Sequence, residues 1–292
     1  MKNFTYGIEI ETVGQTRELV ARAIQTVVGG TVSGFGSGTW TVCDSQGRRW
    51  QAMPDGSLSQ FAHAEIVSPI LRYEDMETLQ AVVRAVRAAG AKVDQSCGIH
   101  VHVGANHFDA RGLANLAKLV HQQEDLIVEA LGIQARRLAQ YTRKLPSSFI
   151  DKIEREKPRT KEDLNRLWYG YQNPTPARYD QSRYHGLNFN SLFYRGTLEF
   201  RWFESSLHAG EVKAYIQFCL ALCAKALKAK AAAGRKRQMS AASGRYDFRV
   251  LLLRLGMIGD EFKTARLHLL SRLKGSAAWK HGTPVAAHAA SA

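Results

Sequence analysis

Alternating polar and apolar residues mark four short segments of the chain, and this period of two predicts β-strands. In segment 4–12, Ile8 and Ile10 alternate with Glu9 and Glu11. Strand side chains point alternately to two faces, so the glutamates should share one face and the isoleucines should face the core. Three further segments carry charged or imidazole side chains at i and i+2: His63 and Glu65 in 63–69, His100 and His102 in 95–104, and Glu199 and Arg201 in 197–203.

Apolar residues recur at helical spacing in six longer stretches, namely 15–28, 75–89, 109–131, 210–232, 245–256 and 259–274. Asp109 is the expected N-cap of the 109–131 helix, and the run from Thr160 to Asp163 resembles a capping box that opens a short helix. His121 and Glu124 fall on the polar side of the 109–131 helix, so we expect both at the surface. Strands and helices together predict an α+β fold, with a curved, largely antiparallel sheet packed against helices.

A predicted hairpin joins residues 183–191 to residues 197–204 across a turn at 194–196. It brings three polar side chains beside the charged pair of the second strand: Arg183, His185 and Asn188. We expect the imidazole and the amide of this set to contact a cofactor.

The segments between these elements have looser patterns. Residues 39–43 and 48–53 predict a further hairpin, and the Gly-Ser-rich run 34–38 predicts a mobile loop because it lacks the Lys of a phosphate-binding loop. Residues 134–180 are the least periodic part of the chain. The tyrosines and arginines from Arg166 to Tyr184 have two interpretations: a surface that stacks an adenine or holds an acidic substrate, or a small local core.

Composition narrows the class of protein. The chain has 292 residues, 45% of them hydrophobic, which is enough for a full core. No apolar run approaches 18 residues and no secretory leader pattern precedes the first strand, so a membrane span is not expected. The cysteines lack the spacing of a metal motif and indicate thiols in a reducing, cytoplasmic location: Cys43, Cys97, Cys219 and Cys223.

The net charge of +14 is concentrated near the C-terminus. Residues 225–292 hold 14 Lys and Arg against three Asp and Glu, whereas residues 1–224 are nearly balanced. Solvated helix ends explain this excess, and a surface that binds a polyanion such as nucleic acid is the alternative. We expect a catalytic domain over 1–224, a basic helical addition over 225–274 and a disordered tail over 275–292.

The four strands indicate metal chemistry if they lie side by side. Acidic residues are depleted from strand interiors, and neighbouring carboxylates repel each other unless a positive charge lies between them. Carboxylates with an imidazole suit Mg²⁺ or Mn²⁺, which keep several waters and commonly bridge phosphates. The pattern therefore points to a divalent metal and a nucleotide.

Five motifs carry a resemblance to a known family: GIEIE at 7–11, EIVSP at 65–69, CGIHVHVG at 97–104, RYHGLN at 183–188 and GTLEFRWFE at 196–204. In this order, over about residues 4–222, the chain resembles the amidoligase family, compact relatives of glutamine synthetase and glutamate–cysteine ligase. The resemblance implies a sheet of the glutamine synthetase type and an ATP- and Mg²⁺-dependent ligase. Its substrates would be a carboxylate and an amine, either of them free or on a peptide or protein.

The resemblance also implies roles for individual residues. Glu11 and Glu65 would hold one metal ion. A second ion, which bridges the ATP phosphates, would be held by Glu9, His100 and Glu199. Arg201 would contact the carboxyl or acyl-phosphate group.

The remaining steps leave alternatives open. His102 or Arg183 is a candidate to neutralise the departing phosphate, and Asp55 or Glu204 is a candidate base for the amine. For Asp55 an ordinary Asp-Gly turn is the slightly favoured interpretation, whereas the acidic residue that the family has there points to the site. A metal-dependent phosphoesterase and a non-enzymatic basic binding module are the two alternative functions.

Overall fold

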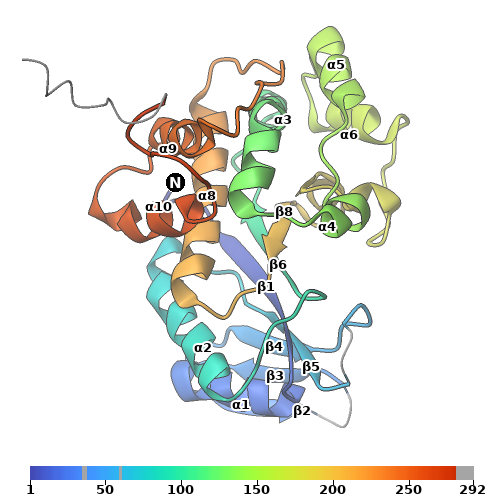
Figure 1. The fold of residues 1–292 in the computed structure, drawn as a ribbon. Helices are drawn as coiled ribbons and strands as arrows, with labels where there is room; N and C mark the ends of the chain where they lie inside the picture. The colour runs from blue at the N-terminus through green and yellow to red at the C-terminus, as the bar shows by residue number, and fades with distance from the viewer. Residues whose placement is uncertain (35–37, 59–60, 281–292) are drawn as a thin grey trace, which may run out of the picture.

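The computed structural model describes residues 1–34, 38–58 and 61–280, and its described part contains one open antiparallel sheet of eight strands (Figure 1). The strand order across the sheet is β2-β3-β4-β5-β1-β6-β8-β7. The strands are β1 (Tyr6–Val13), β2 (Thr31–Gly34), β3 (Trp40–Cys43), β4 (Arg49–Met53), β5 (His63–Val67), β6 (Gly98–Gly104), β7 (Leu187–Asn188) and β8 (Thr197–Glu204). The predicted α+β class and antiparallel sheet are confirmed.

Ten α-helices accompany the sheet within the described residues. They are α1 (Arg17–Val28), α2 (Met76–Ala88), α3 (Ala110–Leu131), α4 (Ala135–Gln140), α5 (Ser147–Glu156), α6 (Lys161–Tyr169), α7 (Asn190–Arg195), α8 (Ala209–Lys228), α9 (Gly244–Arg254) and α10 (Lys263–Leu270). Asp109 caps α3 and Thr160 forms a capping box with Asp163 at α6, as the sequence predicts. None of these helices is long and apolar enough to cross a membrane.

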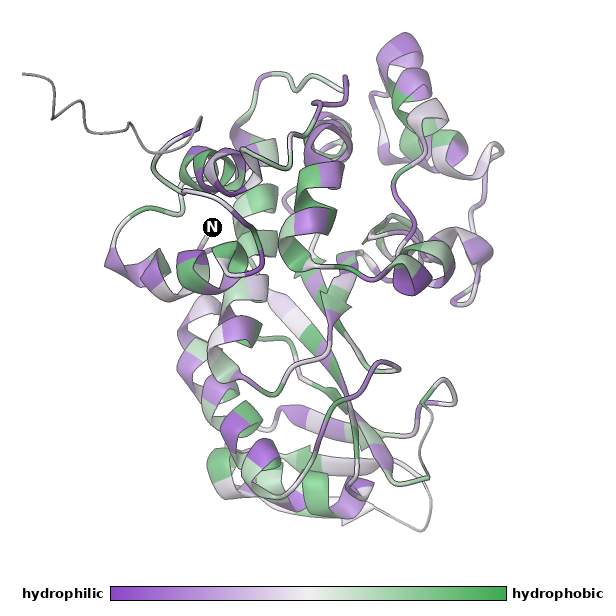
Figure 2. Ribbon diagram, in the orientation of Figure 1, coloured by the Kyte–Doolittle hydropathy of each residue, from purple (hydrophilic) through white to green (hydrophobic). Residues whose placement is uncertain are grey.

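One face of the sheet forms the core. The apolar residues of the central strands, such as Ile8, Ile10 and Val101, are buried against helices. Helix α1 packs on β3 and β4, α8 packs on β6, and α3 packs on β8. Figure 2 shows hydrophobic and hydrophilic residues alternating along these helices, which gives each of them a buried and an exposed side. The opposite face of the central strands is left for polar side chains.

The C-terminal helices extend this core. Helix α10 packs on α8 and α9 packs on α3, and the same cluster of buried side chains reaches from Phe4 to Leu273. The predicted disordered tail begins inside the described part, where Arg245 Nη1 donates a hydrogen bond to the Gly275 carbonyl (3.4 Å). Its remainder, residues 281–292, lies outside the described residues, as do residues 35–37 of the predicted mobile loop.

The strand predicted over 183–191 is wrong except at Leu187 and Asn188, which form β7. The Asn188 side chain accepts the N–H groups of Asn190 (2.8 Å) and Ser191, so the chain turns into α7 instead of continuing as a strand. Gly196 ends α7 in the left-handed conformation (φ 77°) before β8 begins. The two strands still pair, with Asn188 opposite Glu199.

The surface position expected for His121 and Glu124 is also wrong, because both side chains are buried. Helix α5 packs on α3, and the segment that follows α8 also crosses α3. His121 contacts the Gly234 carbonyl (2.8 Å) and Ser147 Oγ (3.1 Å) through its two ring nitrogens. The Leu145 N–H donates to Glu124 Oε2 (2.9 Å). Polar residues on this side of α3 therefore join a buried network.

Candidate functional site

Polar side chains of β5, β1, β6 and β8 meet on the face of the sheet opposite the core. The strand register sets Glu11 opposite Glu65, Glu9 opposite His100, and His102 opposite Glu199. Cross-strand partners of this kind have Cβ atoms about 5 Å apart, which brings their side-chain termini into contact. The period of two in the sequence thus predicted the shared face correctly.

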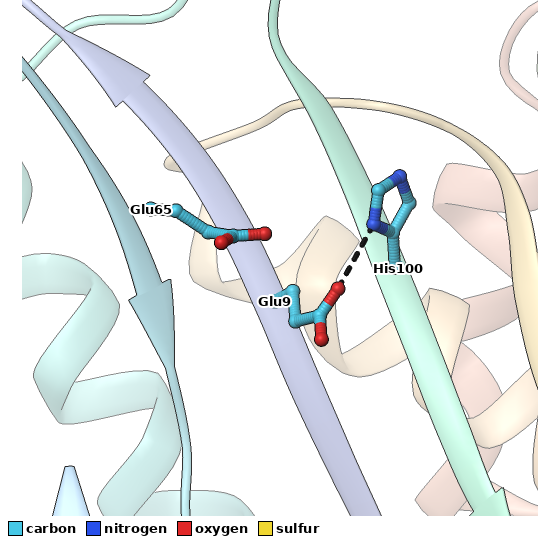
Figure 3. Close-up of side chains that lie close together, drawn as sticks. All are labelled: Glu9, Glu65 and His100. Atoms are coloured by element: carbon cyan, nitrogen blue, oxygen red, sulfur yellow. Dashed lines mark hydrogen bonds and ion pairs between the residues drawn. The ribbon is translucent and has the colours of Figure 1, made fainter. Parts of the chain in front are cut away.

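Three overlapping groups within the described residues could each hold a metal ion. Their ligand atoms lie within 4.8 Å of one another: Glu9, Glu65 and His100; Glu9, His102 and Glu199; and Glu11, Asp55 and Glu65. Figure 3 shows the first group, in which Glu65 and His100 approach Glu9 from the two flanking strands. His100 Nδ1 lies 3.1 Å from Glu9 Oε2 and 3.8 Å from Glu199 Oε1. His102, expected to assist phosphate release, joins Glu9 and Glu199 as a possible ligand.

The carboxylates fall into two electrostatic classes. Burial raises the pKa of Glu65 to about 9, aided by the charges of Glu9, Asp55 and Glu11, and burial also raises the pKa of Glu11. Burial opposes ionisation of Glu9 and Glu199 too, but the cations beside them outweigh it. His102 and His100 hold the pKa of Glu9 well below its usual range, and Arg201 with the same histidines lowers that of Glu199 to about 2.

This set of donors fits divalent cations. The Nε2 atom of His102 is buried without a hydrogen-bond partner among the described residues, and it lies 3.4 Å from Glu9 Oε1 and 3.9 Å from Glu199 Oε1. An unpaired buried imidazole nitrogen facing two carboxylates is an arrangement that a metal ion satisfies. Burial, with neighbouring carboxylates, raises the pKa values of Glu11 and Glu65, and a cation bound between these side chains would favour their ionised forms. Two of the groups combine carboxylates with one imidazole and the third has carboxylates alone, and such oxygen-rich sets favour Mg²⁺ or Mn²⁺.

Arg201 is held beside this cluster at a β-bulge. Ile99 pairs with Phe203 whereas Val101 pairs with Phe200, so β8 carries one extra residue around Arg201 and Trp202. Arg201 Nη1 donates to Glu199 Oε1 (2.5 Å), and the Asn188 amide donates to Glu199 Oε2 (2.6 Å). The Nε atom of the same buried guanidinium has no partner among the described residues. Arg201 therefore retains a free donor beside the candidate metal ligands.

A cavity of about 350 Å³ opens over the cluster and contains most of the predicted residues. Its lining includes Glu9, Glu11, Asp55, Glu65, His100, His102, Arg183, Asn188, Glu199 and Arg201. A second cavity of about 290 Å³ shares Glu9, His102 and Arg195 with the first. Both cavities therefore reach Glu9 and His102 of the candidate metal groups.

Three of the candidates lie elsewhere. His185 is absent from the lining of the main cavity, and its ring packs edge-on against Trp168 (ring centroids 5.1 Å apart). Burial, with the charge of Arg143, lowers the pKa of His185 to about 4. Glu204 and His63 also do not line the cavity, and Glu204 Oε2 lies 4.0 Å from Arg272. The expected cofactor contact of His185 assumed a regular strand over 183–191. The observed strand, β7, begins only at Leu187, after His185.

Two arginines that line the cavity, Arg137 and Arg195, were not predicted from the sequence. Arg137 of α4 is buried, donates from Nη1 to the Cys97 carbonyl (3.3 Å) and leaves Nε without a partner among the described residues. Its guanidinium fills the space beside Gly98, where a Cβ atom would lie 2.5 Å from Nη2. Arg195 ends α7 and reaches Glu9 Oε1 (3.5 Å). Gly98 is the one signal in the sequence, because a glycine inside a strand allows another group to approach closely but does not indicate which one.

Comparison with known proteins agrees with this geometry. A search of curated proteins finds no significant match to the chain. The family model described as "Putative amidoligase enzyme" matches residues 2–223, well over half of the chain. The match ends inside α8 and includes every strand and all the candidate metal ligands. The chain therefore belongs to the amidoligase family.

Proposed function

We propose that this protein is an ATP-dependent carboxylate–amine ligase that forms an amide bond through an acyl phosphate. One observation carries the proposal: three overlapping groups of metal-ligand side chains lie beside a buried arginine with a free donor. A carboxylate is a poor electrophile because its leaving group would be oxide. Transfer of the γ-phosphoryl group of ATP to the carboxylate supplies a leaving group that an amine can displace. Such a reaction needs the ATP phosphates and the substrate carboxylate held close together, with positive groups beside them that offset their repulsion.

The residues divide this work between them. Glu11 and Glu65 would hold one divalent ion, and Glu9, Glu199 and the two histidines would hold another. Ions at these ligands screen the charges of the phosphates and the carboxylate, which otherwise repel each other. Arg201 aims its free donor at an oxygen of the reacting carboxyl group, because the Glu199 ion pair fixes its guanidinium. His102, one of the two candidates to neutralise the departing phosphate, lines the same cavity beside the metal ligands.

The amine must lose a proton before or during attack, and Asp55 is the group we assign to this step. One of its oxygens, Oδ1, accepts the backbone N–H and the hydroxyl of Ser57 (both 2.7 Å), which orients the carboxylate at the cavity. Its other oxygen remains available to a metal ion or to the amine. We assign the reaction to residues 1–224 as a catalytic domain of the glutamine synthetase type, acting on a free or peptide-borne carboxylate in the cytoplasm.

Trapping with hydroxylamine tests the proposal. An acyl phosphate reacts with this small nucleophile to give a hydroxamate, so ATP, Mg²⁺ or Mn²⁺ and the correct carboxylate should together yield hydroxamate and an equal amount of ADP. Free amino acids, short peptides and acidic metabolites form the screen. The same residues also suit a metal-dependent phosphoesterase, the alternative function. Absence of ATP binding with every metal, alongside hydrolysis of a phosphoester that requires Glu9 and Glu199, would establish that alternative.

A further inference from the structure

Arginine and tyrosine side chains alternate along one wall of the main cavity. The guanidinium carbons of Arg178 and Arg183 each lie 5.2 Å from the Tyr179 ring centroid. Arg183 also lies 5.7 Å from the Tyr184 ring centroid, and Arg201 lies 5.9 Å from the same centroid. Arg201 in turn pairs with Glu199, one of the candidate metal ligands. We call these arginines and tyrosines the arginine–tyrosine wall. Tyr179 is 66% exposed and Arg201 only 4%, so the wall leads from solvent to the buried reaction site.

The segment that bears this wall is fixed to the scaffold. Arg143 donates from Nε and Nη2 to the carbonyls of Tyr184 (3.2 Å) and Gln181 (2.8 Å). The Asn190 amide donates to the Ala177 carbonyl (3.1 Å), and the Arg201 N–H donates to the Gly186 carbonyl (2.8 Å). These bonds hold both ends of the segment, so the wall is formed before any ligand arrives.

The positive charges of the wall are largely uncompensated. Arg178 and Arg183 form no ion pair with any described residue, in contrast to Arg201, which pairs with Glu199. Arg137 adds a second buried guanidinium near Arg201, with its Nε free among the described residues. Guanidinium groups bind carboxylates through two parallel hydrogen bonds, which a planar donor array without a protein partner favours.

We propose that the acyl substrate is an acidic peptide, with one carboxylate at Arg201 and Arg137 and a second carboxylate at Arg178 and Arg183. This inference rests on the ligase proposal, because it is the reacting carboxylate that reaches Arg201. The peptide chain lies against Tyr179 and Tyr184 and leaves the cavity at its exposed end. A single small amino acid would fill the buried end and leave the outer cations unused.

The second cavity explains why the wall is assigned to the peptide and not to the nucleotide base. That cavity is lined by Ile8, Val67, Pro69 and Ile70, and Ile70 is 76% exposed. The apolar part of this lining suits a base, because the arginine that the cavity contains, Arg195, pairs with Glu9 (3.5 Å). The shared residues Glu9 and His102 connect the cavity to the metal ligands. A nucleic acid on the wall, the rival polyanion, would instead stack its bases on the tyrosines.

Binding without turnover tests the inference. Fluorescein-labelled tetraglutamate and tetraglutamine are titrated by anisotropy in Mg²⁺ with a non-hydrolysable ATP analogue, for wild type and for Arg178→Gln/Arg183→Gln. The control variant is Arg155→Gln/Arg159→Gln, one arginine in the last turn of α5 and one in the segment that follows it, neither of which lines the cavity. Wild type and control should bind tetraglutamate at least tenfold more tightly than tetraglutamine, and the wall variant should lose this preference. Arg178→Gln alone should lose part of it.

Three results would overturn the inference: no preference for tetraglutamate in wild type, an equal preference in the wall variant, or stronger competition by an oligothymidylate of equal charge. A rise in the Kd of the ATP analogue in the wall variant, with peptide binding intact, would assign the wall to the nucleotide and overturn it as well. These readouts need no ATP cleavage. Peptide binding through the wall without any hydroxamate product would therefore reject the ligase proposal alone.

Discussion

Two regions of this molecule bring glutamate and histidine together, and they differ in how many charged groups they crowd into one place. In the α3 network, Glu124 Oε2 accepts the Leu145 N–H, Glu124 Oε1 has no partner among the described residues, and both nitrogens of His121 have partners. On the sheet, Glu9, Glu11, Glu65 and Glu199 share one face with two histidines, and His102 Nε2 has no partner among the described residues. The first arrangement ties three segments of the chain together.

The difference lies in charge crowding, because Glu11 and Glu199 on the sheet are buried as Glu124 is. Burial raises the pKa of Glu124 to about 8, which favours its neutral form. The strand cluster has more carboxylates than its histidines and arginines compensate, and it opens to a cavity. A surplus of ionisable groups that the fold does not need is the feature that marks a functional site.

Neutralising one ligand of the cluster should give the largest effect. We expect Glu11→Gln and Glu199→Gln each to lower turnover by about 10³-fold or more, because each removes a charged metal ligand. Steady-state ADP release and Mn²⁺ titration measure this. Glu124→Gln, from the α3 network outside the cavity lining, should keep its activity within about twofold. Full activity of both site variants with unchanged metal affinity would remove the metal-site account.

The same two variants should separate in stability when metal is absent. Glu199→Gln leaves the buried Arg201 guanidinium without its ion-pair partner, at a cost of about 3 kcal/mol or more. Glu11→Gln relieves repulsion at a site whose pKa is already raised, so its stability should hold or rise. Urea unfolding in chelator measures both. Equal destabilisation of the two would mean that the carboxylates serve one common structural role.

Arg201→Lys should be nearly as damaging as Arg201→Ala, with about 10²-fold loss in kcat/KM for each. Lysine keeps the charge but lacks the planar fork that holds Glu199 and a substrate oxygen at once. A lysine enzyme close to wild type would make Arg201 a general electrostatic contributor instead of a clamp.

The smallest effect concerns pH and the α3 network. The pKa of Glu124 is raised to about 8 in the fold, so the folded state keeps a proton that the unfolded state releases near its ordinary value. Its contribution to stability is complete below that ordinary pKa and is lost as pH rises through about 8. Glu124→Gln should therefore flatten the dependence of unfolding free energy on pH between 5 and 8.

The neighbouring acid is the matched control for this measurement. Burial opposes ionisation of Asp125, but Lys144 outweighs it and lowers the pKa, which places its titration below the same window. Asp125→Asn should leave the slope between pH 5 and 8 as in wild type. A flattened slope in Asp125→Asn, or an unchanged one in Glu124→Gln, would contradict the assignment of the buried proton to Glu124.

The sequence predicted the strand-borne half of the site because period two is a local property. The spacing within each strand assigned Glu9 and Glu11 to one face of β1, and His100 and His102 to one face of β6. The register between β1 and β6 then brought Glu9 opposite His100. Arg137 could not be predicted, because it reaches the cavity from α4, which lies in the least periodic part of the chain. The bulge at Arg201 depends on how β8 pairs with β6, and His185 turns away because β7 is only two residues long. The positions of Arg137, Arg201 and His185 therefore depend on contacts between segments distant in the sequence, which a local pattern does not encode.

Oxygen transfer tests the central claim most directly. The carboxylate that yields hydroxamate is prepared with ¹⁸O in its carboxyl group and is incubated with ATP, Mg²⁺ and the amine. Formation of an acyl phosphate moves one carboxyl oxygen into the phosphate when the amine displaces it. We predict that each inorganic phosphate released in amide formation carries one ¹⁸O, and that Glu199→Gln releases none above background. Unlabelled phosphate formed at the full rate would mean that water supplies the oxygen, and it would contradict the ligase mechanism.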